Sequence, residues 1–462
     1  MAENFELLNA LLQKLAIVVM GPDSINNLKV PEGYFISFCT PGIAVDQADF
    51  DFGFVAPGAN QTSAAADFAS VANTVPPPQG RWMASDNKLD DVYAMILRDS
   101  LFPTVQLSVQ EKKSLQAARD LLIHDIQTID PATGGVVTRP ADTPLFEAYK
   151  EREAIYLNAA ADYRSLQVNL LYSDDPKAKT EWALKGPIFE KRVRAAYNSW
   201  VPVKDQVEKA LAIIDTIGAR GPELYWSGLK QRFERSKFST PEGDQYYLTK
   251  YFPGKFWDDA HKGGWLKFTF GYNEVHQINE SSSMNVGGGG SVSVGLWSIG
   301  ASASYAEQRE FFKADIANTA LQVSLTVVPI RRSWFDASIL KSRGWKFDPN
   351  INQNVLSDGG TPPKGLLPAY ATAMILARDL KLSTDMSSEQ NEHVATQFSA
   401  SGSVGWGPFS VRGNYSRNTD RRTHDFVKNA AGLEAPGMQI IGYMCEYVGK
   451  LPNPDNNLNW GQ

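Results

Sequence analysis

Two stretches of the chain, residues 281–306 and 394–411, alternate small polar with apolar residues and contain no charged side chain. In the first stretch the apolar residues move from even to odd positions after Trp297-Ser298, and in the second they do so after Trp406. Because side chains alternate along a strand, a parity change across a short Gly, Pro or Ser turn keeps the apolar residues of both arms on one face. The pattern therefore predicts two amphipathic β-hairpins.

The length and composition of these hairpins are typical of membrane-spanning β-strands. An arm such as 284–296 would extend roughly 40 Å and, when tilted, would cross a hydrocarbon core of about 30 Å. A helix is disfavoured because six Gly and eight Ser occur among residues 281–306. In a transmembrane barrel, lipid-facing and lumen-facing residues alternate along each strand. We therefore predict that lipid faces Met284, Val286, Val292, Val294, Leu296, Ile299, Ala301, Ala303, Tyr305, Val394, Phe398, Ala400, Val404, Trp406, Phe409, Val411 and Tyr415, and that the lumen faces Ser291, Ser293, Ser302 and Ser401.

Two other structures have the same pattern. Gly and Ser alternating with Val and Ala also form flat, stacked sheets in self-assembling proteins, and ordinary exposed ribbons of a β-sandwich. A structural protein whose hairpins pair between subunits in a ring, tube or fibre is therefore the alternative to an oligomeric pore.

The whole chain is predicted to divide into three regions of an α+β fold. Residues 1–80 contain a docking helix, then short strands at 34–39 and at the alternating Phe50, Phe52 and Phe54. Residues 81–238 are predicted to be helical, and residues 239–462 to form an antiparallel β domain with hairpins at about 278–314 and 390–425.

Several helix boundaries in the second region have recognisable signals. Ser108 and Glu111 have the spacing of a capping box. Thr143-Pro144 opens what we predict to be the longest helix, and Asp175-Pro176 starts the next, which Gly186-Pro187 and Pro202 are expected to interrupt.

Beyond residue 240 the apolar period changes to two. Strands are predicted at 265–272, 321–330, 370–382 and 438–448, the last apolar on both faces as for a central strand. The order is therefore strand, hairpin, strand, link, strand, hairpin, strand. Each hairpin is inserted between two strands of the domain.

This order, over about 265–448, resembles the central sheet of the membrane attack complex/perforin and cholesterol-dependent cytolysin superfamily and of gasdermins. The aromatic-Gly-Thr/Ser-His signature of the perforin group is absent from the link at 331–368, which reads Arg331-Arg332-Ser333-Trp334 at its start. The resemblance implies a homo-oligomer that inserts two hairpins per subunit into a lipid membrane.

Composition excludes several other classes of function. Lys and Arg total 45 against 51 Asp and Glu, so no basic field is available to bind nucleic acid. Motifs for phosphate loops, nucleophile elbows and zinc sites are missing, and only five histidines occur, so we expect no enzyme, no cofactor and no metal. Cys39 and Cys445 are expected to be buried and unpaired.

The N-terminus lacks the basic residues of a signal peptide, and no run of about 20 apolar residues occurs. We therefore expect synthesis in the cytoplasm and, if the protein is released, action on a target membrane. The sequence identifies no protein receptor.

Overall fold

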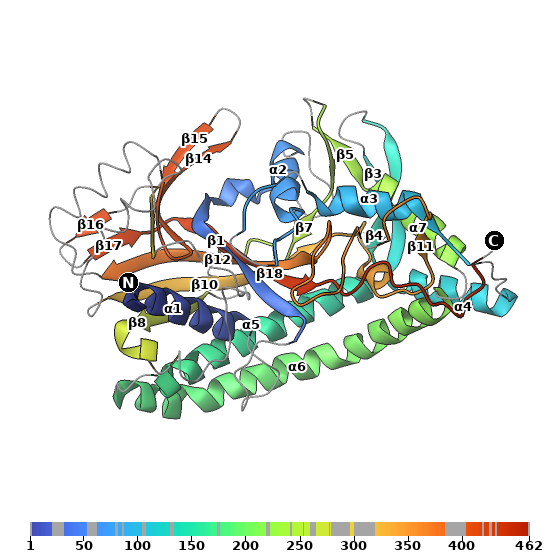
Figure 1. Ribbon diagram of the computed structural model, residues 1–462. Coiled ribbons are helices and arrows are strands. Elements are labelled where there is room, and N and C mark those ends of the chain that lie inside the picture. Colours follow the sequence, from blue (N-terminus) through green and yellow to red (C-terminus); the bar gives the residue numbers. More distant parts are fainter. Residues whose placement is uncertain are drawn as a thin grey trace.

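The computed structural model of the protein has an α+β fold, which confirms the predicted fold class (Figure 1). It describes the chain apart from residues 1, 21–31, 53–61, 79–81, 86, 104–107, 130–133, 173–175, 219–221, 241–242, 253, 259–264, 277, 279–295, 300–318, 354, 384–402, 418–419, 425–426, 430–431 and 461–462. The helices are α1 Ala2–Met20, α2 Thr62–Ala72, α3 Leu89–Asp99, α4 Val109–Asp120, α5 Pro144–Tyr172, α6 Pro176–Gly218 and α7 Pro222–Arg235, with 3-10 turns η1 Gln47–Asp49, η3 Tyr272–Glu274 and η4 Ala337–Leu340.

The strands form one large sheet and several small ones. The large sheet contains β1 Tyr34–Val45, β7 Lys250–Tyr251, β8 Leu266–Gly271, β10 Ala320–Arg331, β12 Ala369–Ser383, β16 Val427–Asn429, β17 Gly432–Ala435 and β18 Met438–Tyr447. The small sheets contain β2 Ser100–Leu101, β3 Ile123–Ile129, β4 Val136–Asp142, β5 Lys237–Ser239, β6 Gln245–Tyr247, β9 Trp297–Ile299, β11 Lys346–Phe347, β13 Ser403–Trp406, β14 Phe409–Arg417 and β15 Asp420–His424.

The large sheet is antiparallel and has the order β1-β18-β12-β10-β7, with β8 also paired to β10 and β17 to β12. The four predicted strands of the C-terminal region are thus confirmed as β8, β10, β12 and β18. Strand β18 lies between β1 and β12, as expected for a strand that is apolar on both faces. Strand β1 therefore joins the N-terminal part of the chain to the C-terminal sheet.

Each face of the sheet packs against different helices. On one face Phe268, Val323 and Ile375 share a core with the buried residues of α1, which lies between the sheet and α5 (Figure 1). On the other face Met374 packs in an aromatic core with Phe68 of α2. Helices α5 and α6 run side by side along the first face, and a third core joins α3, α4, α6 and α7 to the link between β10 and β12.

The capping box is confirmed, because Ser108 Oγ accepts from the Glu111 amide at 3.2 Å and Glu111 Oε2 accepts from the Ser108 amide at 2.9 Å. The predicted starts of α5 and α6 are also confirmed. Cys39 and Cys445 are buried and unpaired, as expected.

The predicted interruptions of the second long helix are wrong. Helix α6 continues through Pro187 and Pro202 for 43 residues, and is longer than α5 with 29. Helix α6 packs against α5, and this packing stabilises a helix in which each proline removes a hydrogen bond. Trp200, two residues before Pro202, stacks on Tyr156 of α5 with 5.4 Å between ring centroids.

Two other local predictions are wrong. Residues 123–129 and 136–142 pair as β3 and β4 within the region predicted to be helical, and Gly134, which precedes β4, has φ +68°. Phe50 and Phe52 lie after η1 and not in a strand. Both rings contact Phe68 and Tyr251, so their alternation reflects packing around a bend and not a pleated strand.

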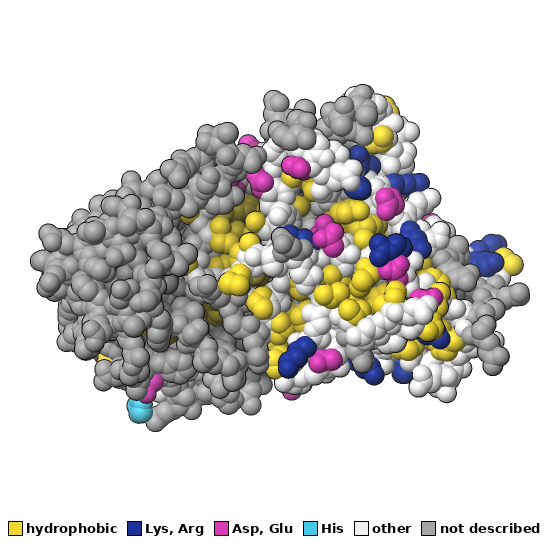
Figure 2. Space-filling view, turned by 45° about the horizontal axis from the view of Figure 1, so that its top comes forward, with side chains coloured by type: hydrophobic (Ala, Val, Ile, Leu, Met, Phe, Trp, Pro, Cys, Tyr) yellow, Lys and Arg dark blue, Asp and Glu magenta, His cyan; other side chains and the backbone are white. Residues whose placement is uncertain are grey.

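On the face shown in Figure 2, basic and acidic side chains are interspersed with apolar ones over the described part of the chain. The described part of this face therefore carries no field of a single sign.

Candidate functional site

Two segments are inserted between strands of the large sheet, the first between β8 and β10 and the second between β12 and β16. These inserted segments leave the sheet side by side. The first leaves at the end of β8 and returns at the start of β10, where Gly271 pairs with Ala320. Ala320 in turn pairs with Ser383, at which the second segment leaves β12. That segment returns through β16, which pairs with β17, and Leu433 of β17 pairs with Leu382 of β12. All four attachment points therefore lie on neighbouring strands at one end of the sheet, to the left in Figure 1.

Many of the predicted site residues lie outside the described residues. These are Met284, Val286, Ser291, Val292, Ser293, Val294, Ala301, Ser302, Ala303, Tyr305, Val394, Phe398, Ala400 and Ser401. The others lie immediately before β9 (Leu296), in β9 (Ile299), in β13 (Val404 and Trp406) or in β14 (Phe409, Val411 and Tyr415).

Strands β13 and β14 form a tight hairpin at the position where the apolar residues change parity. Trp406 pairs with Phe409 across Gly407-Pro408, and Gly407 has φ +55°. A positive φ at the first turn residue is typical of two-residue hairpins and favours glycine there. Strand β14 has nine residues, about the length of a membrane-spanning β-strand.

The turn predicted at Trp297-Ser298 is wrong. These residues belong to β9, which pairs with β13 so that Trp406 lies opposite Trp297. The segment lacks a glycine at a central turn position, and Trp and Ile favour strands. Parts of the two inserted segments therefore pair with each other in the small sheet β15-β14-β13-β9.

Four apolar residues in or next to this small sheet are buried. Leu296, Trp406, Phe409 and Val411 are each at most 4% exposed and share one core with α1. A Cβ atom placed on Gly407 would lie 3.1 Å from Leu11 Cδ2 and 3.4 Å from Leu8 Cδ1 of α1. In this structure α1 therefore covers the turn between β13 and β14.

Two hydrogen bonds from one side chain attach β14 to the large sheet. The buried Gln439 of β18 accepts from the Ser410 amide through Oε1 at 2.6 Å and donates through Nε2 to the Ser410 carbonyl at 3.0 Å. The Gln439 amide thus takes the place of a strand partner for this residue of β14.

Polar side chains also attach α1 to neighbouring elements, at Lys14 and at its C-terminal end. Lys14, 1% exposed, forms an ion pair with Glu274 and donates to the Thr269 carbonyl at 2.8 Å. Burial lowers the pKa of Lys14, and the Glu274 carboxylate opposes this shift. Glu274 Oε1 also accepts from the Gly271 amide at 3.1 Å, at the point where the first segment leaves β8. At the end of α1, Arg164 of α5 donates to the carbonyls of Val18 and Val19, both at 3.4 Å.

Lys14, Glu274 and Gln439 were not among the residues predicted from the sequence. Lys14 has a recognisable signal, since it is a single cation within an apolar helical run. Its partner is 260 residues away, so the pairing itself could not be predicted.

Comparisons with protein-family models, with curated proteins and with solved structures gave no match. Among the described helices, none has the length and apolar character needed to cross a bilayer.

Proposed function

We propose that the protein forms oligomeric pores by inserting its two Gly/Ser-rich segments into a membrane as β-hairpins. One observation carries this proposal: both segments leave the same end of one antiparallel sheet from neighbouring strands. Four strands extended from these points would continue the pairing of β8, β10, β12 and β17. Barrel closure between subunits would then satisfy the backbone groups of every strand, as a lipid environment requires.

In this proposal the structure corresponds to the state before insertion. Four residues predicted to contact lipid, Leu296, Trp406, Phe409 and Val411, lie in a core with α1. They can reach lipid only after the contacts of α1 with Gly407 and of Gln439 with Ser410 have opened. We therefore assign α1 the role of a cover that must leave before the second segment inserts.

The alternative function is self-assembly without lipid. The small sheet has β9 and β15 as its outer strands, and outer strands can pair with another chain. In that case the inserted segments would join subunits into a ring, tube or fibre.

Negative-stain electron microscopy of the purified protein, with and without liposomes, distinguishes these functions. Rings that form only with liposomes would support the pore. Ordered assemblies in buffer that do not change when liposomes are added would support the structural alternative and contradict the pore.

A further inference from the structure

A large hollow separates the long helices from the sheet, on the same face as α1. It consists of a cavity of about 610 Å³ at the start of α5 and one of about 950 Å³ farther along the helix. Glu153, Pro329 and Thr372 line both cavities, so the two adjoin. Each volume is in the range of small-molecule sites, about 300–1,000 Å³.

The first cavity contains a cation with unused hydrogen-bond donors. Arg331, at the end of β10, has Nε and Nη2 buried with no hydrogen-bond partner among the described residues. Its guanidinium lies 4.2 Å from the centre of the Phe252 ring. Leaving charged donors buried without a partner is costly, so this arrangement favours an acceptor in the cavity.

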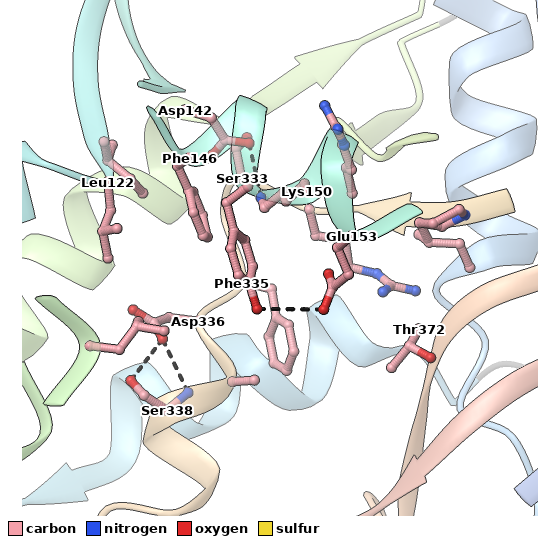
Figure 3. Close-up of a pocket in the computed structure, with 18 of the residues that line it drawn as sticks. Leu122, Asp142, Phe146, Lys150, Glu153, Ser333, Phe335, Asp336, Ser338 and Thr372 are labelled. Atoms are coloured by element: carbon pink, nitrogen blue, oxygen red, sulfur yellow. Dashed lines mark hydrogen bonds and ion pairs between the residues drawn. The ribbon is translucent and has the colours of Figure 1, made fainter. Parts of the chain in front are cut away.

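Each carboxylate that lines this cavity has a bonded oxygen, although Asp142 Oδ1 has no hydrogen-bond partner among the described residues. Asp142 pairs with Lys150 at 2.9 Å, and Glu153 accepts from Tyr149 at 3.4 Å (Figure 3). Asp336 pairs with Arg232 at 3.1 Å. Burial raises the pKa of Glu153 and so disfavours its charged form. The carboxylates of Asp142, Glu147, Glu151 and Glu153 interact electrostatically with Arg331, but no described group accepts a hydrogen bond from its Nε or Nη2. These two donors can therefore bind an acceptor from outside the chain.

The second cavity has apolar residues next to this charge, and its cations Arg164, Arg194 and Lys204 already contact other groups of the protein. Ala154 of α5, Val327 of β10 and Ala373 of β12 line it and are each at most 6% exposed. Thr372 lies at the junction, because it lines both cavities. The hollow thus joins the unused donors of Arg331 to a space lined mainly by apolar and aromatic side chains.

We propose that this hollow binds a single-chain anionic amphiphile, with its carboxylate or phosphate head on Arg331 and its acyl chain in the second cavity. The proposal does not depend on pore formation, because the hollow lies outside the inserted segments. The proposed ligand is a single soluble lipid-like molecule, bound in addition to any membrane.

Isothermal titration calorimetry below the critical micelle concentration tests the proposal. The probes are myristate, 1-myristoyl lysophosphatidate, myristyl alcohol and inorganic phosphate. We expect the two acidic amphiphiles to bind, and the alcohol and free phosphate to bind at least about tenfold more weakly, because each lacks one part of the recognised structure. Preference between the two acidic probes identifies the head as a carboxylate or a phosphate.

Two variants, each with a matched control, locate the binding site. Arg331→Gln should weaken binding of the preferred amphiphile by about tenfold or more, whereas Arg98→Gln, a change at a side chain 72% exposed, should not. Thr372→Phe should block the junction and weaken myristate much more than octanoate, whereas Thr372→Val should leave both unchanged. The Thr372 pair tests the site even if Arg331→Gln does not fold. The proposal is overturned if neither acidic amphiphile binds, if free phosphate binds as well as the lysolipid, or if folded variants bind like the wild type.

Discussion

The Lys14 ammonium is paired with the Glu274 carboxylate. Glu274 also accepts from the Gly271 amide, where the first inserted segment leaves β8, so the pair joins α1 to the start of that segment. Both side chains are buried, and Lys14 also donates to the Thr269 carbonyl. The pair couples α1, which covers the β13–β14 turn, to the base of the other inserted segment. A disturbance at this ion pair would therefore reach both segments.

Removing one partner of this pair should be strongly destabilising. Lys14→Met leaves the Glu274 carboxylate buried without its cation, and we expect a loss of about 3–5 kcal/mol in the free energy of unfolding. Adding Glu274→Gln should restore most of this loss, because no unpaired charge then remains. Urea unfolding followed by far-UV circular dichroism measures both variants. A matched control is Lys185→Met, at an exposed pair with Glu181, which should change stability by at most about 0.5 kcal/mol. If Lys14→Met lowers the free energy of unfolding no more than this control does, the buried pair does not hold α1.

Loss of the Gln439 side chain should loosen β14. Gln439→Ala leaves the Ser410 amide and carbonyl without these partners, which should cost about 1–3 kcal/mol. Hydrogen exchange measured by mass spectrometry should become faster in peptides covering 409–417. Gln206→Ala, which removes an exposed hydrogen bond to Pro202, serves as the control. Unchanged exchange in the β14 peptides would argue against the attachment.

A methyl group on Gly407 should disturb the contact between the hairpin and α1. The residue has φ +55°, so Gly407→Ala introduces about 1–2 kcal/mol of backbone strain, and its Cβ would lie 3.1 Å from Leu11 Cδ2. Thermal unfolding should show a lower Tm. At Gly449 a Cβ would meet nothing within 4 Å, so Gly449→Ala should have little effect. Equal Tm values for the two variants would contradict the close packing of α1 on this turn.

Asp90 should make the protein less stable as the pH rises above 4. Burial raises its pKa to about 6, and Asp90 Oδ1 has no hydrogen-bond partner among the described residues. Because the pKa in the unfolded chain is near 3.9, the folded protein binds more protons between about pH 4 and 6, and this contribution is lost as the pH rises. Asp90→Asn should therefore be more stable than the wild type by about 1–2 kcal/mol at pH 7 and similar to it at pH 4. A stability difference that is the same at both pH values would contradict the raised pKa.

The order of the C-terminal strands could be predicted because period-two patterns and turn residues are local signals. Strands β8, β10, β12 and β18 each follow such a pattern. The burial of the hairpin residues could not be predicted, because it depends on α1, which is distant in sequence. Trp406 and Phe409 have the same alternation whether they face lipid or the leucines of a helix. The single polar residues that fix this arrangement, Lys14 and Gln439, have no pattern that identifies their partners.

Release of a fluorescent dye from liposomes tests pore formation most directly. We expect the wild-type protein to release dye, and Val292→Asp and Val404→Asp to abolish release, since each places a charge on the predicted lipid face at a cost of about 2–4 kcal/mol per subunit. Val136→Asp, at a β4 side chain 69% exposed and outside both segments, should release dye like the wild type. Intact liposomes with the folded wild-type protein, across lipid compositions and pH values, or equal release by all four proteins, would contradict insertion of these hairpins.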